Sequence, residues 1–297
     1  MSALPPVSVI VVSCDAPLTL ERCLESLEGQ LRPGAEVIVA DCSAEDPRLH
    51  FRQQFPHVRF LRYERRSIPE LRREALRVAR GEILAMTEAR LVPDKNWLST
   101  LLDAHRRHPE SPAIGGTIGY AAGSAFDAAV FFCEYGWHVP PIDDGSAAEL
   151  SGANLSYKRS VLELCKDLVD SAAWEPFLHR SLEQHGYRLR RAGQALVVYR
   201  NSLTFGQFLR QRFHYGRWFA AERAASATWL LRLLYAGFCP LLPFLLTARL
   251  GRLAFGRGHA GTFLRALPAV LAFETLWSCG EFCGYLFGKG NSDRQVF

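Results

Sequence analysis

The sequence of 297 residues has no CxxC pair, although it holds eight cysteines. Their sparse spacing excludes a zinc site of the paired-cysteine type and a disulfide-stapled secreted scaffold. We therefore expect reduced thiols in a cytosolic or cytosol-facing protein. Lysine is also scarce, with four in all, so arginine is the default cation. Hydrophobic residues make up 48% and charged residues 22%, which excludes a disordered or collagen-like chain.

Acidic residues are almost absent between positions 200 and 265. This segment has ten arginines, no lysine and a single acid, Glu222, so its formal charge is +9. Because the whole chain is +5, the remainder carries −4. An uncharged apolar run, 233–248, lies in the same segment. Basic residues beside an apolar run favour a membrane surface, so we expect membrane lipid as a partner and no nucleic acid.

No apolar run reaches the length of about 20 residues that spans a bilayer without interruption. The run 233–248 is shorter and contains two prolines, and a second stretch, 266–288, is interrupted by Glu274 and Glu281. These glutamates are spaced to share one helix face, so we expect them to face protein and not lipid. We predict a membrane-associated apolar hairpin at 228–297, with the N-terminal domain on the cytoplasmic side. A buried hairpin in a soluble oligomer is the alternative.

The first 115 residues alternate strand-like and helix-like segments. The first strand follows no basic region and is too short for a signal-peptide core, so no secretion is implied. Strands are predicted at 7–12, 36–40, 58–63 and 83–86. Apolar strands that alternate with helices predict an α/β domain with a doubly wound, mostly parallel sheet, here within 1–205.

Polar residues follow three of these strands, at 13–15, 41–43 and 87–90. In doubly wound sheets ligands bind at the carboxyl ends of the strands, so we expect binding residues there. Further along the chain, residues 206–227 combine aromatic side chains with arginines. This mixture favours an amphipathic helix lying on anionic lipid, and a helix packed on the protein core is the alternative.

Several sequence blocks occur in a fixed order. They are VSVIVVSCD at 7–15, VIVADCS at 37–43, ELRREAL at 70–76, ARGEIL at 79–84, LVPDKNWL at 91–98 and SGAN at 151–154. Together they resemble the family 2 glycosyltransferases, which have the GT-A fold, and the resemblance extends from residue 5 to about 220. It implies a hexosyltransferase-type enzyme in polysaccharide or glycolipid biosynthesis. Such an enzyme moves a sugar, with inversion, from a nucleotide-diphospho-sugar donor to a lipid-linked or saccharide hydroxyl at a membrane.

The resemblance implies nucleotide contacts at the first two strand ends. Asp41 would accept a hydrogen bond from the base, and Asp15 belongs to the same nucleotide site. A turn-forming role before Ser43 is the alternative for Asp41. Arg72 would approach the diphosphate, with Arg73 in place of the family's asparagine, and a solvated helix face would explain both arginines.

The block around residue 90 departs from the family pattern. Counted back from Pro93, the usual pair of metal-binding carboxylates corresponds to Glu88 and Arg90. Glu88 can take the first position near the ribose and a metal, but Arg90 has no lone pair for a cation. Three interpretations stay open here. Arg90 replaces part of the charge of Mg²⁺ or Mn²⁺; a metal binds through Glu88, the diphosphate and water; or the chain is a catalytically inactive nucleotide-sugar-binding relative that serves as a membrane assembly partner.

The resemblance also implies a catalytic carboxylate at the start of a helix. Glu175 stands in this place, and Pro176 replaces the family's second carboxylate. Glu175 would remove the proton from the acceptor hydroxyl. A favourable interaction with the helix dipole is the bland explanation of Glu175, and Asp170 is the alternative base.

Two further blocks are assigned to the acceptor or the sugar. The SGAN block would contribute Asn154. The sequence HYGRW at 214–218 is similar to the QxxRW motif of processive members, with histidine in place of glutamine. By this similarity Arg217 would contact the diphosphate and Trp218 would stack on the acceptor sugar, whereas an interfacial helix would explain both residues equally well.

Overall fold

The computed structural model describes residues 7–64, 66–173 and 175–295. The chain divides into two compact units, one of Met1–Ala121 with Pro140–Arg200 and one of Ala122–Val139 with Asn201–Phe297. The sequence-based division at residue 205 lies close to the second of these boundaries. It did not separate residues 122–139, which belong with the C-terminal helices in the second unit.

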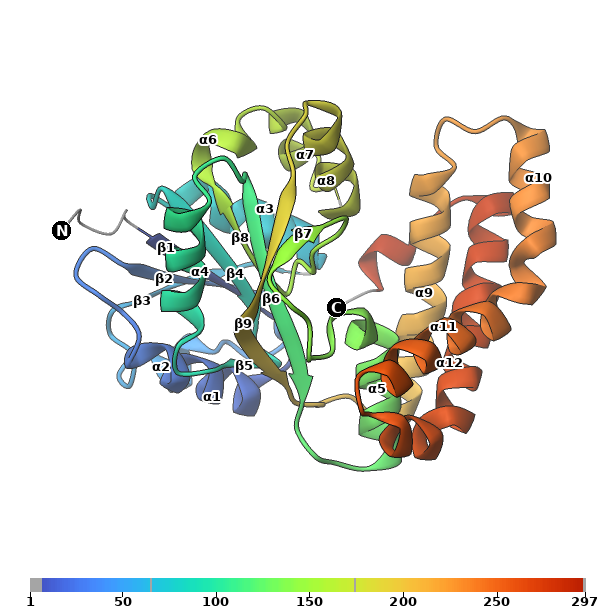
Figure 1. Cartoon of the computed structure of the whole chain (residues 1–297), viewed down its shortest axis with the longest axis horizontal. Helices are drawn as coiled ribbons and strands as arrows, with labels where there is room; N and C mark the ends of the chain where they lie inside the picture. Colours follow the sequence, from blue (N-terminus) through green and yellow to red (C-terminus); the bar gives the residue numbers. More distant parts are fainter. Residues whose placement is uncertain (1–6, 65, 174, 296–297) are drawn as a thin grey trace. The chain divides into compact units, whose positions relative to one another are not determined.

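The first unit is built on a nine-stranded sheet among the described residues, in the order β3-β2-β1-β4-β8-β6-β9-β5, with β7 beside β9 (Figure 1). The strands are β1 (Val7–Ser13), β2 (Glu36–Asp41), β3 (Val58–Arg62), β4 (Ile83–Glu88), β5 (Leu91–Pro93), β6 (Ala113–Tyr120), β7 (Gly145–Ala147), β8 (Asn154–Lys158) and β9 (Leu189–Tyr199). The four strands predicted from the sequence correspond to β1–β4.

The sheet is parallel on one side and mixed on the other. Strands β3, β2, β1 and β4 run parallel, as predicted for a doubly wound sheet. Strand β8 is antiparallel to both β4 and β6, so the second half departs from the mostly parallel sheet that was expected. The strand order reverses direction between β1 and β4, and ligands bind doubly wound sheets at such a reversal.

Helices cover both faces of the sheet (Figure 1). They are α1 (Pro17–Glu28), α2 (Arg48–Phe51), α3 (Ile68–Val78), α4 (Trp97–Arg107), α6 (Arg159–Leu162), α7 (Lys166–Asp170) and α8 (Glu175–Gln184). Ile10 and Val12 of β1 join one core cluster with Leu71 of α3 and Leu178 of α8. The intervening Val11 is also buried, on the opposite face. Burial on both faces explains why these strands read as continuous apolar runs.

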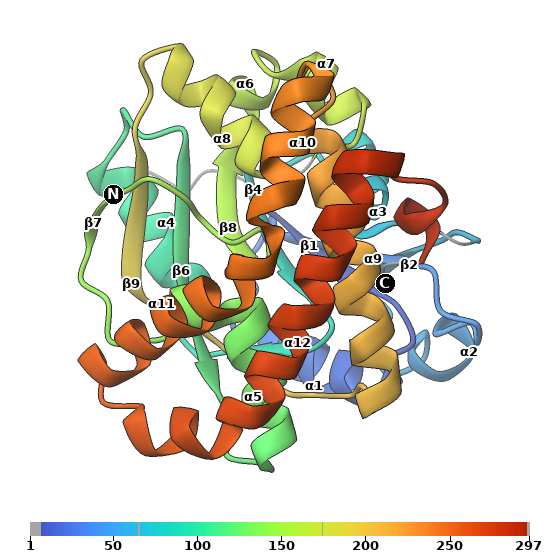
Figure 2. The same ribbon diagram turned by 90° about the vertical axis from the view of Figure 1, so that its right-hand side faces the viewer.

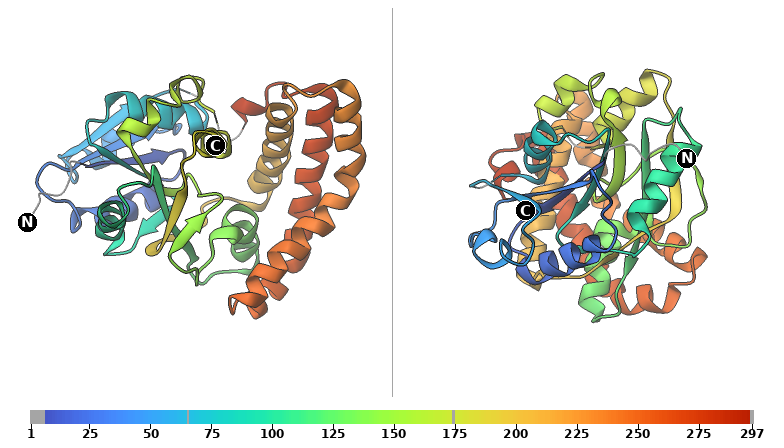
Figure 3. Two further views of the ribbon diagram at one scale, coloured as in Figure 1. Left: turned by 45° about the horizontal axis from the view of Figure 1, so that its top comes forward. Right: turned by 90° about the vertical axis from the view of Figure 1, so that its left-hand side faces the viewer.

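The second unit is helical. Its elements are α5 (Ala125–Tyr135), the 3₁₀ turn η1 (Gly136–His138), α9 (Phe205–Arg223), α10 (Trp229–Phe238), the 3₁₀ turn η2 (Cys239–Leu241), α11 (Leu242–Gly256), α12 (Ala260–Phe287) and the 3₁₀ turn η3 (Ser292–Arg294). Helix α12 contacts α5, α9, α10 and α11. Helices α10 and α11 follow one another end to end, and α9 and this stretch lie beside α12 (Figures 2 and 3). Helix α9, which the sequence predicted to lie on lipid, runs along α12, with Phe208 fully buried against Phe273.

Glycines bring α9 and α12 into backbone contact. A Cβ atom on Gly216 would lie 2.3 Å from the carbonyl oxygen of Trp277, and one on Gly280 would lie 2.1 Å from that of Phe213. Gly284 faces the same helix and completes a G-x-x-x-G pattern with Gly280. Small residues at this spacing let two helix backbones approach closely, as at interfaces between membrane helices.

The two glutamates of α12 face the interior of the unit. Glu274 and Glu281 are 2% and 5% exposed. Arg212 of α9 pairs with Glu274 at 2.8 Å, and Trp277 Nε1 donates to Glu281 at 2.6 Å. The expectation that these acids face protein is therefore confirmed. Their partners explain how an otherwise apolar helix accommodates them.

Helices α10 and α11, with the turn between them, form a helical stretch from Trp229 to Gly256. It is long and apolar enough to cross a membrane, judged by its length and composition alone. It extends beyond the predicted run 233–248 at both ends. Arg249, expected in the loop between the two apolar stretches, lies within α11, where its guanidinium stacks 3.8 Å from the ring centroid of Trp137.

Candidate active site

One arginine joins the two acidic residues that the sequence assigned to the reacting centre. Arg72 of α3 places Nη2 2.7 Å from Glu88 Oε1, at the end of β4. Its Nη1 pairs with Glu175 Oε1, on the first residue of α8. The three side chains are 8%, 20% and 13% exposed. The structure therefore brings together three predicted site residues from three separate parts of the sequence.

Local structure explains how these side chains meet. Helix α3 begins at a capping box in which Ser67 and Glu70 satisfy each other's backbone N–H groups. Burial of Leu71 against the sheet then fixes the rotation of the helix that carries Arg72. Residue 88 continues the alternation of the buried residues of β4, such as Met86, so Glu88 extends from the sheet face that α3 covers.

Gly152 lies directly against the ion pair. A Cβ atom at this position would be 2.4 Å from Glu175 Cδ and 2.5 Å from Arg72 Nη1. No side chain fits without moving the pair, so the glycine of the SGAN block leaves room for it. The SGAN block was part of the family resemblance in the sequence. The sequence alone did not show which residues Gly152 faces.

Apolar residues surround the inner side of the pair. A small cavity of about 30 Å³ is lined by Arg72 and Glu175 together with apolar side chains that include Met86 and Leu178. Arg72 Nε is buried and has no hydrogen-bond partner among the residues that the structure describes. In such surroundings the two carboxylates and the guanidinium depend on one another, because an unpaired buried charge costs several kcal/mol.

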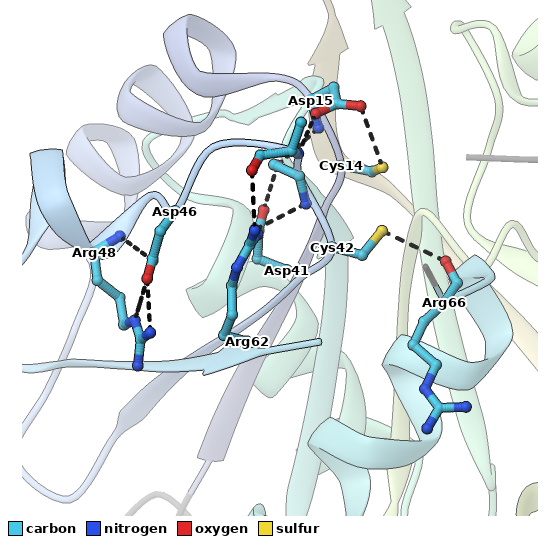
Figure 4. Close-up of polar contacts among 10 residues, drawn as sticks. Cys14, Asp15, Asp41, Cys42, Asp46, Arg48, Arg62 and Arg66 are labelled. Carbon is cyan, nitrogen blue, oxygen red and sulfur yellow. Dashed lines mark hydrogen bonds and ion pairs between the residues drawn. The ribbon is translucent and has the colours of Figure 1, made fainter. Parts of the chain in front are cut away.

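The ends of β1 and β2 form a second polar cluster (Figure 4). The carboxylate of Asp41 is 1% exposed and accepts hydrogen bonds from Ser43 Oγ at 2.7 Å and Arg62 Nη1 at 2.8 Å. Ser43 Oγ also accepts from the backbone N–H of Asp15 at 2.8 Å. Asp15 has a left-handed φ of 47° and accepts at 2.7 Å from the backbone N–H of Ala44. The two predicted nucleotide residues are thus linked through Ser43.

Sequence reasoning missed both Arg62 and the bridging role of Ser43. Arg62 is the strand partner of Asp41 in the β2–β3 register, which becomes visible only when the two strands are aligned. A signal did exist in the sequence, since Arg62 lies next to the last residue of the third predicted strand and Asp41 directly follows the second. Ser43 belongs to the polar residues expected after the second strand, but the sequence assigned it no contact.

Arg90 lies in the turn between β4 and β5, and its carbonyl oxygen accepts from the backbone N–H of Arg200 at 2.9 Å. The neighbouring thiol of Cys42 and burial raise the pKa of the Cys14 thiol, and the positive charge of Arg90 opposes this rise. The location of the Arg90 guanidinium near the ribose and diphosphate stays a prediction.

The side chains near Glu88 offer few ligands for a divalent metal. Among the described residues there is no group of three or more His, Cys, Asp or Glu side chains that could hold an ion. Glu88 is already paired with Arg72, and Arg90 is itself a cation. A hard divalent ion prefers several oxygen ligands, so a metal held by protein side chains alone does not fit these residues.

Asn154, predicted to contact the sugar or acceptor, is fully buried. Its Oδ1 accepts from Trp97 Nε1 at 2.7 Å, and its Nδ2 donates to the carbonyl oxygens of Thr117 and Ala195, both at 2.8 Å. The carboxamide thus ties neighbouring strands together. This placement does not support a contact between Asn154 and a sugar.

Asp170, the alternative base, pairs with Arg77 and not with Arg72. Asp170 is half exposed, and its carboxylate is 3.5 Å from Arg77. Arg73, which replaces the family's asparagine, pairs with Glu74 at 2.7 Å. The contacts of Arg72 therefore favour Glu175 over Asp170 as the carboxylate at the site.

Arg217 and Trp218 belong to the second unit. Arg217 Nε donates to the carbonyl oxygen of Gly288 at 2.9 Å. Trp218 is 6% exposed, and its Nε1 lies 3.3 Å from Glu222 Oε1. Both residues thus have contacts within that unit: Arg217 contacts the residue that follows α12, and Trp218 contacts a residue of α9 itself.

The comparisons with known proteins agree with this fold. The family model described as Glycosyl transferase family 2 matches residues 8–162, more than half of the chain, and the chain belongs to this family. Family and fold together support glycosyl transfer from a nucleotide sugar.

A solved structure shares the GT-A fold with this chain. The crystal structure of GalNAc-T7 with UDP, GalNAc and Mn²⁺ is similar with a TM-score of 0.53 and 16% sequence identity. The match covers 67% of this chain and 44% of that chain, so this chain spans less than half of that protein's length. The search of curated proteins found no match.

Replacing Arg72 by glutamine should lower the free energy of unfolding by about 3 kcal/mol, because Glu88 and Glu175 would be left as neighbouring charges without a cation. Arg77→Gln is the matched control on the same helix. Arg77 is half exposed, and its loss should cost less than about 1 kcal/mol. Urea unfolding followed by circular dichroism measures both. Equal stability of the two variants would contradict the dependence of the site on Arg72.

Proposed function

We propose that this protein is an inverting glycosyltransferase that uses a nucleotide-diphospho-sugar, with Glu175 as the general base. The observation that carries the proposal is the pairing of Arg72 with both Glu88 and Glu175. It joins a base, a strand-end carboxylate and a cation at the sheet edge where this fold class binds ligands. Family membership supplies the class of reaction.

The proposed reaction is a single displacement. The acceptor hydroxyl oxygen attacks the anomeric carbon of the donor while the carboxylate of Glu175 takes up the hydroxyl proton. The bond between that carbon and the diphosphate oxygen breaks, and the bonding electrons leave with the diphosphate. Because attack comes from the side opposite the leaving group, the anomeric configuration is inverted.

The leaving diphosphate needs positive charge, and two arginines are available for it. Arg72 faces the end of β4 through its pairing with Glu88, and Arg90 follows that end in the sequence. The ribose and diphosphate are expected there. A guanidinium can hold phosphate oxygens in a bidentate manner. We infer that the diphosphate draws Arg72 away from Glu175, so that the base becomes available to the acceptor when the donor has bound. A metal bridging Glu88 and the diphosphate would be the alternative source of charge.

The nucleotide base is proposed to bind at the ends of β1 and β2, near Asp15 and Asp41. The carboxylate of Asp41 already accepts from Ser43 and Arg62. The carboxylate is 1% exposed, so a base N–H reaches it only if one of these donors moves aside. Arg62 is the more accessible of the two, because its side chain is 24% exposed.

Glu175→Gln should reduce donor turnover by about 100-fold or more while nucleotide binding is retained, because the amide cannot accept the proton. Turnover is followed as the release of nucleoside diphosphate from a panel of nucleotide sugars. Asp170→Asn is the control and should keep the activity of the wild type.

Equal, background-level turnover in the wild type and Glu175→Gln would contradict the proposed enzyme. Retained nucleotide-sugar binding in that case would favour a catalytically inactive assembly partner. A loss of turnover in Asp170→Asn alone would assign the role of general base to Asp170.

Turnover of the wild type should persist in the presence of a chelator, because Arg90 supplies fixed charge at the leaving group. Arg90→Gln should lower turnover by about 100-fold, and the exposed Arg59→Gln should have no effect. Arg90→Asp restores a second carboxylate near Glu88 and should become active only with Mn²⁺ or Mg²⁺. Complete loss of wild-type turnover with chelator, restored by either ion, would contradict this role of Arg90.

We further propose that the second unit attaches the protein to a membrane on its cytoplasmic side. Large apolar side chains are exposed along α10 and α11, which together form the stretch of sufficient length and hydropathy. They include Trp229, Leu230, Leu234, Phe238, Leu241, Phe244 and Leu245, each more than half exposed. So many exposed large apolar side chains on one stretch are unusual for a protein that stays in water.

The membrane setting bears on the acceptor. A transferase held at a lipid surface meets lipid-linked hydroxyls at high local concentration. We therefore propose a lipid-linked or growing saccharide acceptor. The proposal rests on the apolar surface of α10 and α11 and not on a contact in the sheet domain.

The full-length protein should sediment with vesicles that contain phosphatidylglycerol. Replacing both Leu234 and Phe244 by glutamate should weaken this partition at least about tenfold, since each side chain contributes about 1.5–3 kcal/mol when buried in apolar surroundings. Leu49→Glu is the control, because Leu49 is also exposed, at 78%, but lies in the first unit. Wild-type protein that remains entirely in the supernatant would contradict the membrane assignment.

A further inference from the structure

Two cysteines follow paired residues at the ends of β1 and β2. Ser13 and Asp41 are partners in the parallel register of these strands. The backbone N–H of Cys42 donates to the carbonyl oxygen of Ser13 at 3.1 Å, which continues the pairing by one residue. Cys14 and Cys42 are therefore neighbours across adjacent strands. Adjacent strands lie about 4.8 Å apart, within the range of Cα separations that a disulfide bridges.

Both thiols are on the same side of the sheet. Cys14 continues the alternation of Ile10 and Val12, and Cys42 itself packs on the core cluster that contains them. Figure 4 shows the two sulfur atoms side by side. Both residues also lie just beyond the strands, where the backbone can adjust more easily than inside a ladder.

The two thiols are chemically unequal. Each thiol influences the other: the neighbouring Cys42 raises the pKa of Cys14, and the neighbouring Cys14 lowers the pKa of Cys42. Cys42 Sγ itself donates to the carbonyl oxygen of Arg66 at 3.4 Å. Cys42 is also partly exposed, whereas Cys14 is buried. Thiolate character and access together decide which cysteine reacts, so Cys42 is the attacking group and Cys14 the resolving group. By contrast, burial raises the pKa of Cys23 to about 12 and leaves it inert.

We propose that Cys14 and Cys42 form a reversible disulfide that responds to peroxide. The thiolate of Cys42 attacks one oxygen of hydrogen peroxide, the O–O bond breaks, and Cys42 becomes a sulfenic acid while hydroxide leaves. The sulfur of Cys14 then attacks the sulfur of Cys42, the S–O bond breaks, and a second hydroxide leaves. Each hydroxide takes up one thiol proton, so two thiols and one peroxide give one disulfide and two waters.

The disulfide would tie together the two loops that carry Asp15 and Asp41. These loops are otherwise joined by hydrogen bonds through Ser43, which can rearrange. A covalent link at this edge would hold Arg62 and Ser43 on Asp41 and so weaken the binding of a nucleotide base. This consequence rests on the proposed function, whereas the formation of the disulfide does not.

The chemistry is tested on the full-length protein, treated with hydrogen peroxide, quenched with catalase and alkylated. Before alkylation the expected product has a mass lower by about 2 Da, the loss of two hydrogens, and after alkylation under denaturing conditions it carries two alkyl groups fewer than the reduced protein; dithiothreitol should reverse both differences. Tryptic cleavage should join peptide 1–22, which carries Cys14, to peptide 23–48, which carries Cys23 and Cys42. Cys42→Ser should abolish this cross-link, and Cys23→Ser and the exposed Cys279→Ser should retain it.

Oxidation of Cys42 to sulfinic or sulfonic acid without a cross-link would overturn the proposal, as would a cross-link that survives in Cys42→Ser. The consequence is tested by titrating UDP and GDP into the reduced and oxidised proteins. At least tenfold weaker binding after oxidation, restored by dithiothreitol, is expected. Unchanged binding would overturn the regulatory consequence. If neither nucleotide binds the reduced protein, the proposed function fails and the cross-link alone decides the dithiol proposal.

Discussion

The site depends on a single guanidinium that faces two carboxylates. Arg72 reaches both Glu88 and Glu175 only because three elements converge at one edge of the sheet: α3, the end of β4 and the start of α8. Gly152 keeps that edge free of a side chain. Removing the cation would leave like charges close together in a mostly apolar setting, so geometry and charge constrain each other. The arrangement also keeps the carboxylate of Glu175 paired with Arg72, and an anionic ligand that binds Arg72 can break this pair.

The same charge balance bears on the departure from the family's acidic pair. A second carboxylate at position 90 would add negative charge beside Glu88 and would require a metal to offset it. Arginine at this position brings positive charge to the end of β1 instead, as its effect on the Cys14 thiol indicates. Arg72 and Arg90 can together approximate the charge of one divalent ion, although without its compact coordination.

How much the sequence could predict differs between local and long-range features. Strands β1–β4 and the sheet edge that holds the candidate site followed from apolar runs and alternation, because those signals are local. The antiparallel pairing of β8 and the packing of α5 with α12 depend on contacts far apart in sequence, which no periodicity encodes. Asn154 shows the limit most clearly: its place in a family block suggested a sugar contact, but its burial among three strands can be seen only in the fold.

The basic segment 200–265 also acquires a different meaning once its contacts are known. Arg212 pairs with Glu274 inside the second unit, and Arg257 Nη1 donates to the carbonyl oxygens of Trp137 and Val139 at 3.0 and 2.9 Å. Part of the charge counted from the sequence is therefore used within the unit and cannot serve a lipid surface. By contrast, the exposed apolar side chains of α10 and α11 are not buried by packing within the unit. Membrane attachment, as proposed, would thus depend mainly on apolar burial, with the remaining arginines adding an electrostatic contribution near the headgroups.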